Sequence, residues 1–240
     1  NITLHANWLA NDYTITFVVN GGSEIDSITA AYGSSLVEPD APTMTGATFL
    51  GWYSNLELTN AYTFPTNMPA SDHTVYAKWD LNDYTINFDT NGGSAIDPIT
   101  LPYGSPISLP NAPTKLESTF VGWHSDISLT TGYTFPPTMP AYNQTLYAKW
   151  DLNEYTISFD SNGGSSVAVI SQDYGSLVNA PTDPIQIGYD FIGWYQDSAL
   201  EIPFLFPTTM PAYHFTLYAK WSINQYTIIF DTNGGSPLDP

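Results

Sequence analysis

The chain lacks cysteine and arginine, and it contains no long run of apolar residues. Without cysteine it can form neither disulfides nor thiolate-bound zinc, which argues against a small disulfide-stabilised domain and excludes a zinc cluster. Four basic residues stand against 23 acidic ones, giving a net charge of -19. Binding to nucleic acid or anionic membranes depends on Lys and Arg, so we expect no nucleic-acid partner. No apolar stretch approaches the roughly 18 residues of a transmembrane helix, so we expect no membrane insertion in this segment.

What the chain has is aromatic residues and a strict repeat. Aromatics make up 15% of the residues, which favours packed β-structure over disorder. The same residue types return every 71 positions without insertion or deletion. The clearest series are Trp8, Trp79, Trp150 and Trp221, then Tyr13, Tyr84, Tyr155 and Tyr226, and the Gly-Trp pairs at Trp52, Trp123 and Trp194.

The repeat divides the chain into three full units and two fragments. Residues 13–83, 84–154 and 155–225 are each expected to be one repeat with its connector. Residues 1–12 match the end of a preceding repeat, and residues 226–240 match the start of a following one. The chain is therefore expected to be a piece of a longer tandem array.

Each unit opens with a predicted strand and turn. Apolar Tyr84, Ile86 and Phe88 alternate with polar residues, a pattern typical of a half-buried strand. Asn-Gly-Gly follows, and Asn-Gly favours a two-residue hairpin because both positions tolerate positive φ. We predict such structural turns at Asn20, Asn91, Asn162 and Asn233. Later in the unit, residues 120–124 are apolar on both faces, which predicts a central or doubly covered strand.

The order of motifs YTIxF, NGGS, YG, FxGW, MPA and LYAKW resembles the Listeria–Bacteroides repeat, which is related to the B repeat of internalin-type surface proteins. The resemblance covers all three units and both fragments, and its strongest elements are the GW and YAKW motifs. The first unit departs from it at Val18 and Val19, where later units have Asp-Thr or Asp-Ser, and residues 5–8 read HANW. The resemblance implies a β-dominated α+β class: small β-grasp-like, ubiquitin-like domains with little helix, displayed in tandem on bacterial cell surfaces.

The connectors suggest an elongated arrangement. In a β-grasp layout the first and last strands are parallel neighbours, so each unit's termini lie at opposite ends. Residues 80–83 and 151–154 connect the units with four residues, which span at most ~14 Å. We therefore expect a linear array.

No catalytic chemistry recurs with the repeat. The four histidines, His5, His73, His124 and His214, occupy positions where the other units carry different residue types. A histidine-ligated metal site or histidine-based catalysis in every unit is therefore excluded, and no serine lies in a G-x-S-x-G motif. We expect ordinary structural or surface roles for these histidines, no cofactor, and no enzymatic activity.

Acidic residues at the connectors allow one metal hypothesis. Asp80 and Asp83 share one connector, and Asp151 and Glu154 repeat the arrangement. Carboxylates with nearby carbonyl and Asn oxygens are the ligands that calcium prefers, so a cation could stiffen the connector. The alternative is a solvated polar linker.

Lysines and tyrosines supply the remaining candidates. Lys78, Lys149 and Lys220 recur, and we expect edge or surface lysines that pair with a nearby acid or limit edge-to-edge association, with an internal Lys–Asn isopeptide bond as the alternative. Exposed tyrosine rings could contact a glycan or a protein. The candidates are Tyr76, Tyr147 and Tyr218 on the face away from the Trp, and Tyr53 and Tyr195 after the Gly-Trp pairs.

These observations together predict a non-catalytic, extracellular repeat segment of a bacterial cell-surface or secreted protein, acting as a stalk, spacer or adhesin module. Its partners would be the neighbouring repeats of the same chain. The alternatives are a repeat that binds glycan or host protein, and self-assembly into an extracellular filament.

Overall fold

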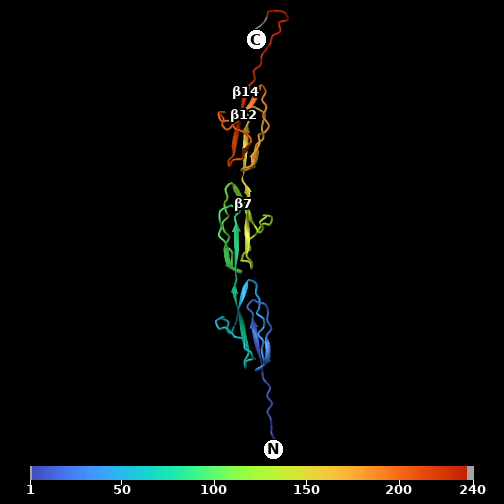
Figure 1. The fold of residues 1–240 in the computed structure, drawn as a ribbon, viewed down its shortest axis with the longest axis vertical. Helices are drawn as coiled ribbons and strands as arrows, with labels where there is room; N and C mark the ends of the chain where they lie inside the picture. The colour runs from blue at the N-terminus through green and yellow to red at the C-terminus, as the bar shows by residue number, and fades with distance from the viewer. Residues whose placement is uncertain (1, 237–240) are drawn as a thin grey trace. The chain divides into compact units, whose positions relative to one another are not determined.

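A computed structural model describes residues 2–236, and three four-stranded sheets follow one another along this part of the chain (Figure 1). All regular structure within residues 2–236 is strand, and no helix occurs there. The expected α+β class with little helix is thus corrected to all-β. The crossings that could have held a helical turn, such as residues 36–43 and 107–114, each contain two prolines, which remove backbone donors and disrupt helical turns.

The first sheet contains β1 (Asp12–Val18), β2 (Ile28–Ala31), β3 (Ala47–Tyr53) and β4 (His73–Leu81). Their order across the sheet is β2-β1-β4-β3. The two central strands, β1 and β4, are parallel, and each outer strand is antiparallel to its neighbour. The first and last strands of the repeat therefore lie side by side.

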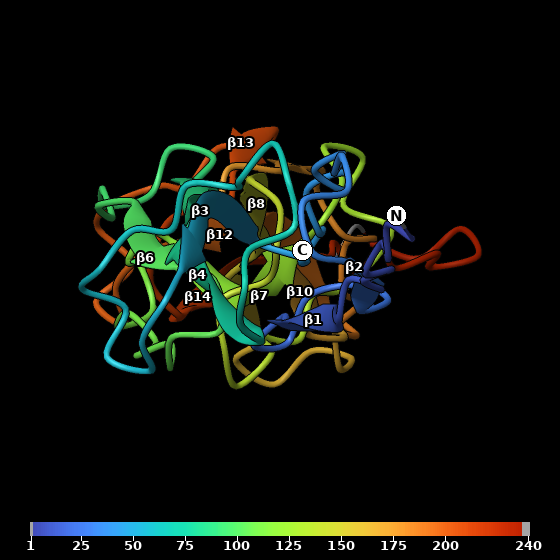
Figure 2. The same ribbon diagram turned by 90° about the horizontal axis from the view of Figure 1, so that it is seen from below.

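The other two sheets have the same order. The second is formed by β5 (Asp83–Asp89), β6 (Ile99–Pro102), β7 (Ser118–His124) and β8 (Gln144–Leu152). The third is formed by β9 (Glu154–Asp160), β10 (Ile170–Asp173), β12 (Tyr189–Tyr195) and β14 (Phe215–Ile223). The third repeat adds a short antiparallel pair, β11 (Leu177–Val178) with β13 (Thr208–Thr209). The strand β13 is labelled in Figure 2.

Alternation along the central strands builds a core on one face of each sheet. In the first repeat Ile15 and Phe17 of β1 and Val75 and Ala77 of β4 are buried there, together with Trp52. In the third repeat a separate cluster forms from the equivalent residues. Aromatic side chains fill much of both clusters, and each such side chain removes a large apolar area from water.

The Gly-Trp strands differ from their predicted position. β3, β7 and β12 are the outermost strands of their sheets, whereas residues 120–124 were expected in a central or doubly covered strand. Their inner face packs on the core, and their outer face exposes an aliphatic side chain. Leu50, Val121 and Ile192 are 51%, 49% and 54% exposed at this position.

The Asn-Gly turn also differs from a two-residue hairpin. β5 and β6 pair only over Asp83–Ile86 and Ile99–Pro102, so residues 87–98 lie between the paired segments. The turn lies within this stretch, and Asn20, Asn91, Asn162 and Asn233 all have φ near +48°. Positive φ was predicted correctly, but the turn does not join two paired strands directly.

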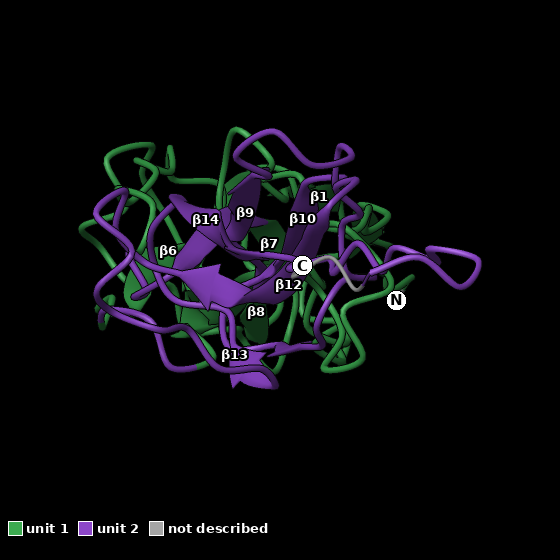
Figure 3. Cartoon of the chain, turned by 90° about the horizontal axis from the view of Figure 1, so that it is seen from above, with its two compact units in different colours: residues 1–91, 95–113, 122–148 green, residues 92–94, 114–121, 149–240 purple. Residues whose placement is uncertain are grey.

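The fragment after residue 225 keeps the turn without the sheet. Residues 226–236 contain no strand, yet the Gly235 N–H still donates to the Thr232 carbonyl at 3.0 Å. The chain as a whole divides into two compact units, residues 1–91, 95–113 and 122–148 in one and residues 92–94, 114–121 and 149–240 in the other (Figure 3). Each joint between repeats described below lies within one of these units.

Candidate functional site

The Asn-Gly-Gly turn fastens the first strand of a repeat to the last one. The side-chain amide of Asn20 donates to the Ala77 carbonyl on β4 at 2.8 Å. Asn91 and Asn162 make the same bond to Ala148 and Ala219, both at 2.7 Å. The turn asparagine therefore does more than adopt positive φ, because it bridges the two central strands.

The last strand returns a second bond to the same turn. The indole N–H of Trp79 donates to the Val19 carbonyl at 3.0 Å, and Trp221 donates to the Ser161 carbonyl at 2.9 Å. The indole lies against the second glycine of the turn, so a Cβ on Gly22 or Gly164 would overlap the ring. This contact requires glycine at the third position of Asn-Gly-Gly, which the sequence pattern alone did not explain.

A side chain just before the last strand fastens its other end. The backbone N–H of Thr14 donates to Asp72 Oδ1 at 2.8 Å, that of Thr85 to Asn143 Oδ1 at 2.7 Å, and that of Thr156 to His214 Nδ1 at 3.1 Å. Asp, Asn and neutral His share only an acceptor atom. The role recurs while the residue type changes, so a search for identical residues missed it.

The remaining histidines have other surroundings. His73 Nε2 lies 3.1 Å from Ser71 Oγ, and His124 is 8% exposed on β7. His5 lies exposed in the leading fragment. The three histidines therefore share no common environment.

One asparagine in each connector joins neighbouring repeats. β4 ends at Leu81 and β5 begins at Asp83, so Asn82 alone separates the two strands. Its backbone N–H donates to the Gly46 carbonyl of the preceding repeat, and its carbonyl accepts from the Tyr103 N–H of the following repeat, both at 2.9 Å. Thr48 Oγ1 donates to the side-chain carbonyl of Asn82 at 2.7 Å.

The second connector repeats these bonds with different residues. Asn153 donates to the Glu117 carbonyl at 3.0 Å and accepts from the Tyr174 N–H at 2.9 Å. Thr119 Oγ1 donates to Asn153 Oδ1 at 2.8 Å. The connectors are therefore hydrogen-bonded to the repeats on both sides through their central asparagines.

The two joints differ at the residue that supplies the carbonyl. Gly46 has φ +71°, and a Cβ there would overlap the ring of Tyr103 from the next repeat. Glu117 has φ +51°, and its carboxylate accepts a hydrogen bond from the hydroxyl of Tyr155. This bond to the carboxylate, followed by burial, raises the pKa of Tyr155 above its ordinary value of 10.0.

The recurring lysine does not lie at a sheet edge, one of the positions expected for it, because β4, β8 and β14 are central strands. Lys78 lies on the central strand β4, where its Nζ donates to the Leu58 carbonyl at 3.2 Å and lies 4.8 Å from the centre of the Tyr53 ring. Lys220 makes the same pair of contacts with Leu200 at 3.0 Å and Tyr195 at 4.6 Å. Both leucines have positive φ, so a strained loop residue presents its carbonyl to the lysine.

The tyrosine candidates separate into two groups. Lysine covers one face of the Tyr53 and Tyr195 rings, which reduces their use as open contact surfaces. Tyr76, Tyr147 and Tyr218 are half-buried on the outer face of the central strands. They are next to the strands that carry the exposed aliphatic residues Leu50, Val121 and Ile192.

The connector acids lie on the strand ends. Asp80 precedes the end of β4 and Asp83 begins β5, while Asp151 and Glu154 lie at the equivalent positions of β8 and β9. All four are exposed. Among residues 2–236 there is no group of three His, Asp or Glu side chains that could hold a metal ion.

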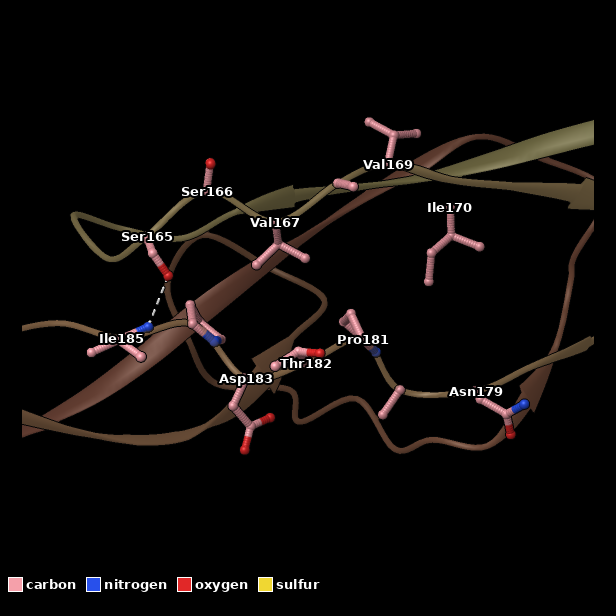
Figure 4. Close-up of a pocket in the computed structure, with 13 residues that line it drawn as sticks. Ser165, Ser166, Val167, Val169, Ile170, Asn179, Pro181, Thr182, Asp183 and Ile185 are labelled. Atoms are coloured by element: carbon pink, nitrogen blue, oxygen red, sulfur yellow. Dashed lines mark hydrogen bonds between the residues drawn. The ribbon is translucent and has the colours of Figure 1, made fainter.

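A cleft of about 480 Å³ lies in the third repeat between residues 165–170 and 179–185 (Figure 4). The Ser165 hydroxyl accepts a hydrogen bond from the Ile185 N–H at 2.9 Å at one end of it. Its walls include aliphatic Val167 and Ile170 and two prolines. The first two repeats carry Asp26 and Asp97 where this one has Ala168, so the cleft's lining is particular to one repeat.

The chain folds into three helix-free sheets of the same topology. Equivalent hydrogen bonds recur within the repeats and between them, which defines a tandem-repeat β-protein. Residues 13–78, 84–149 and 155–220 each match the Listeria-Bacteroides repeat domain. The chain therefore belongs to the Listeria–Bacteroides repeat family, as the motifs predicted.

Similar proteins carry this segment as part of a longer chain. A protein of Evansella cellulosilytica named "Putative Gly-rich membrane protein" is 43% identical over 237 residues, which are 99% of this chain and 27% of the relative. Internalin H of Listeria monocytogenes is 38% identical over 148 residues, which are 61% of this chain and 26% of internalin H. The chain thus spans only about a quarter of the length of these relatives. Within residues 2–236, no helix is long and apolar enough to cross a membrane.

Proposed function

We propose that this segment is a non-catalytic spacer, an elongated stalk within an extracellular bacterial protein that is attached to the cell surface or secreted. The observation that carries the proposal is the joint, in which one connector asparagine hydrogen-bonds to the repeats on both sides. A connector held at three points limits the swing of one repeat against the next. A spacer requires such joints and strict repetition, whereas it requires no reactive residue.

The names of the relatives support the location. One relative is named a membrane protein and another is internalin H. The acidic, cysteine-free composition agrees with an extracellular bacterial segment. We further propose that each repeat is a helix-free variant of the β-grasp layout, since its first and last strands are parallel neighbours at the centre of the sheet.

Small-angle X-ray scattering of the 240-residue chain tests the spacer. We expect a pair-distance distribution with the long tail of an extended particle, unchanged with protein concentration. A compact globule would contradict the proposal, and growth of the particle with concentration would favour the filament alternative. Repeating the measurement in calcium and in chelator tests the connector acids, because a bound cation would change the distribution.

A second candidate function is binding of a glycan or protein partner through the outer face of the sheets. It is favoured by the recurrence of a half-buried tyrosine and an exposed aliphatic side chain there, such as Tyr76 and Leu50. A glycan array and a cell-binding assay with the whole chain test it. Binding that disappears when Tyr76, Tyr147 and Tyr218 are all changed to Ala would support the candidate, and absence of any signal would reject it.

A further inference from the structure

We propose that each repeat is a mechanical clamp that resists unfolding when the chain is pulled from its two ends. The inference rests on the direction in which a pull reaches the two central strands. It deepens the proposed spacer, since only a tether between two bodies would carry such a load. The resistance itself is a property of the single repeat.

The strand register places the central pair in shear. The chain enters the first repeat at Asp12, the start of β1, and leaves it at Leu81, the end of β4. β1 and β4 are parallel, with Ile15 beside His73 and Val18 beside Tyr76. Tension therefore pulls β1 backwards and β4 forwards along their common direction. All hydrogen bonds of the ladder are loaded together, whereas a pull across the ladder would break them one after another.

Side-chain bonds strengthen both ends of this ladder. At one end the Thr14 N–H is held by Asp72 Oδ1 at 2.8 Å. At the other end Asn20 bonds to the Ala77 carbonyl and Trp79 bonds to the Val19 carbonyl. Each of these bonds joins the first-strand side of the repeat to the last-strand side. Sliding of β1 along β4 must break them together with the ladder.

The core opposes the same movement. Ile15 of β1 and Val75 and Ala77 of β4 have no exposed surface, and they pack in one cluster with Trp52 and Met68. Sliding would pull these side chains out of register and open gaps in a close-packed interior. Backbone, side-chain ties and core thus resist one direction of force.

Single-molecule stretching of the whole chain by its termini tests the clamp. We expect three unfolding events of similar force, each lengthening the molecule by no more than ~250 Å, the extended length of a 71-residue repeat. For comparison, Asp12→Cys and Ser71→Cys place handles at the same end of the β1 and β4 pair, and the chain has no other cysteine. A pull between these two points unzips the pair. We expect it to unfold the first repeat at a clearly lower force.

A variant of one repeat separates the ties from general stability. Asn20→Gly keeps positive φ and removes the amide that bonds to Ala77. Held at constant force, one event in three should become roughly fivefold faster, the effect of losing one hydrogen bond that is intact in the folded repeat and already broken at the unfolding barrier. Asn233→Gly changes the same turn where residues 226–236 form no strand, and it should leave all three events unchanged.

The outcomes bear separately on the two proposals. Equal forces in the two pulling directions, or an unchanged rate for Asn20→Gly, would overturn the clamp. A compact particle in scattering, combined with a direction-dependent force, would overturn the spacer and support the clamp.

Discussion

Gly22 has no room for a side chain, because a Cβ built on it would overlap the indole of Trp79. Gly22→Ala must therefore displace the ring and weaken its hydrogen bond to the Val19 carbonyl. We expect a loss of about 1–3 kcal/mol in the stability of the first repeat, as for other overpacked sites. Thermal or denaturant unfolding measures it. Gly132→Ala is the control, since nothing lies within 4 Å of its Cβ position, and an equal loss there would contradict this explanation.

Two carboxylates predict that the stability of the second and third repeats falls in acid. The Thr130 N–H is the main cause that lowers the pKa of Asp126, and the Glu201 N–H lowers that of Asp197. A lowered folded-state pKa means that the contribution to stability is present above the ordinary value of 3.8 and disappears as the pH falls through the lowered one. The second and third repeats should therefore lose stability below about pH 4.

Asparagine supplies a matched control for this titration. Asn55 stands at the same position in the first repeat, and its Oδ1 accepts from the Thr59 and Asn60 N–H groups. Changing Asp126 and Asp197 to Asn should keep the loop bonds and remove the two titrating groups. Unfolding measured between pH 2 and 7 should then show a smaller loss in acid than the parent chain. Equal loss in both chains would show that these carboxylates do not cause it.

At single positions, sequence reasoning predicted conformation better than contacts. Positive φ at Asn20 follows from Asn-Gly alone, and the structure confirms it. The bond from its side chain to Ala77 could not be predicted, because the partner lies 57 residues away on a strand whose register was unknown. The shared role of Asp72 and His214 was hidden because it requires only one acceptor atom.

Among the elements, the joint between the first two repeats depends on Gly46. Its φ is +71°, and the Tyr103 ring occupies the place of a Cβ. Gly46→Ala should push the ring away and disturb the hydrogen bond from the Asn82 N–H to the Gly46 carbonyl. The cores of the first two repeats, which contain Ile15 and Ile86, should remain folded. NMR relaxation measures this as independent tumbling of the two repeats. Glu117 has positive φ at the same position of the other joint. Glu117→Ala is therefore the comparison, and it should leave the tumbling of the first two repeats unchanged. A change confined to stability, with tumbling unaltered, would contradict the role of Gly46 as a joint residue.

The positions of strands in the sequence were predicted more successfully than the order of those strands in the sheet. Alternation identified β5, because period two is a local property. The sheet order was not available from local pattern, so the apolar strand at residues 120–124 was placed at the centre when it forms an edge. Helix was expected only through the resemblance, and the proline-containing crossings at residues 36–43 and 107–114 contain none.

For the whole molecule, the strict period was the most informative feature of the sequence. It predicted three repeats, and the family match finds them at residues 13–78, 84–149 and 155–220. The period could not reveal how the repeats meet. That depends on backbone bonds of Asn82 and Asn153 to residues far along the chain, and backbone bonds leave no signature in residue type.

Interchangeable joints predict that one whole repeat can be removed. Deleting residues 84–154 joins Asp83 to Tyr155, so the Gly46 and Asn82 half of one joint meets Tyr174 from the other. The two remaining repeats should unfold at nearly the same temperature as in the parent chain. This is expected because each repeat contacts only its neighbours. In the proposed elongated array, losing one of three repeats should shorten the longest dimension in scattering by roughly a third.

Deleting residues 84–151 is the matched control for this change. It removes the same sheet but leaves residues 152–154 as additional connector, which separates Asn82 from the next repeat. Both shortened chains should fold, and only the control should show independent tumbling of its two repeats by NMR relaxation. Tumbling that is equal in the two chains would mean that the asparagine joint does not fix one repeat to the next.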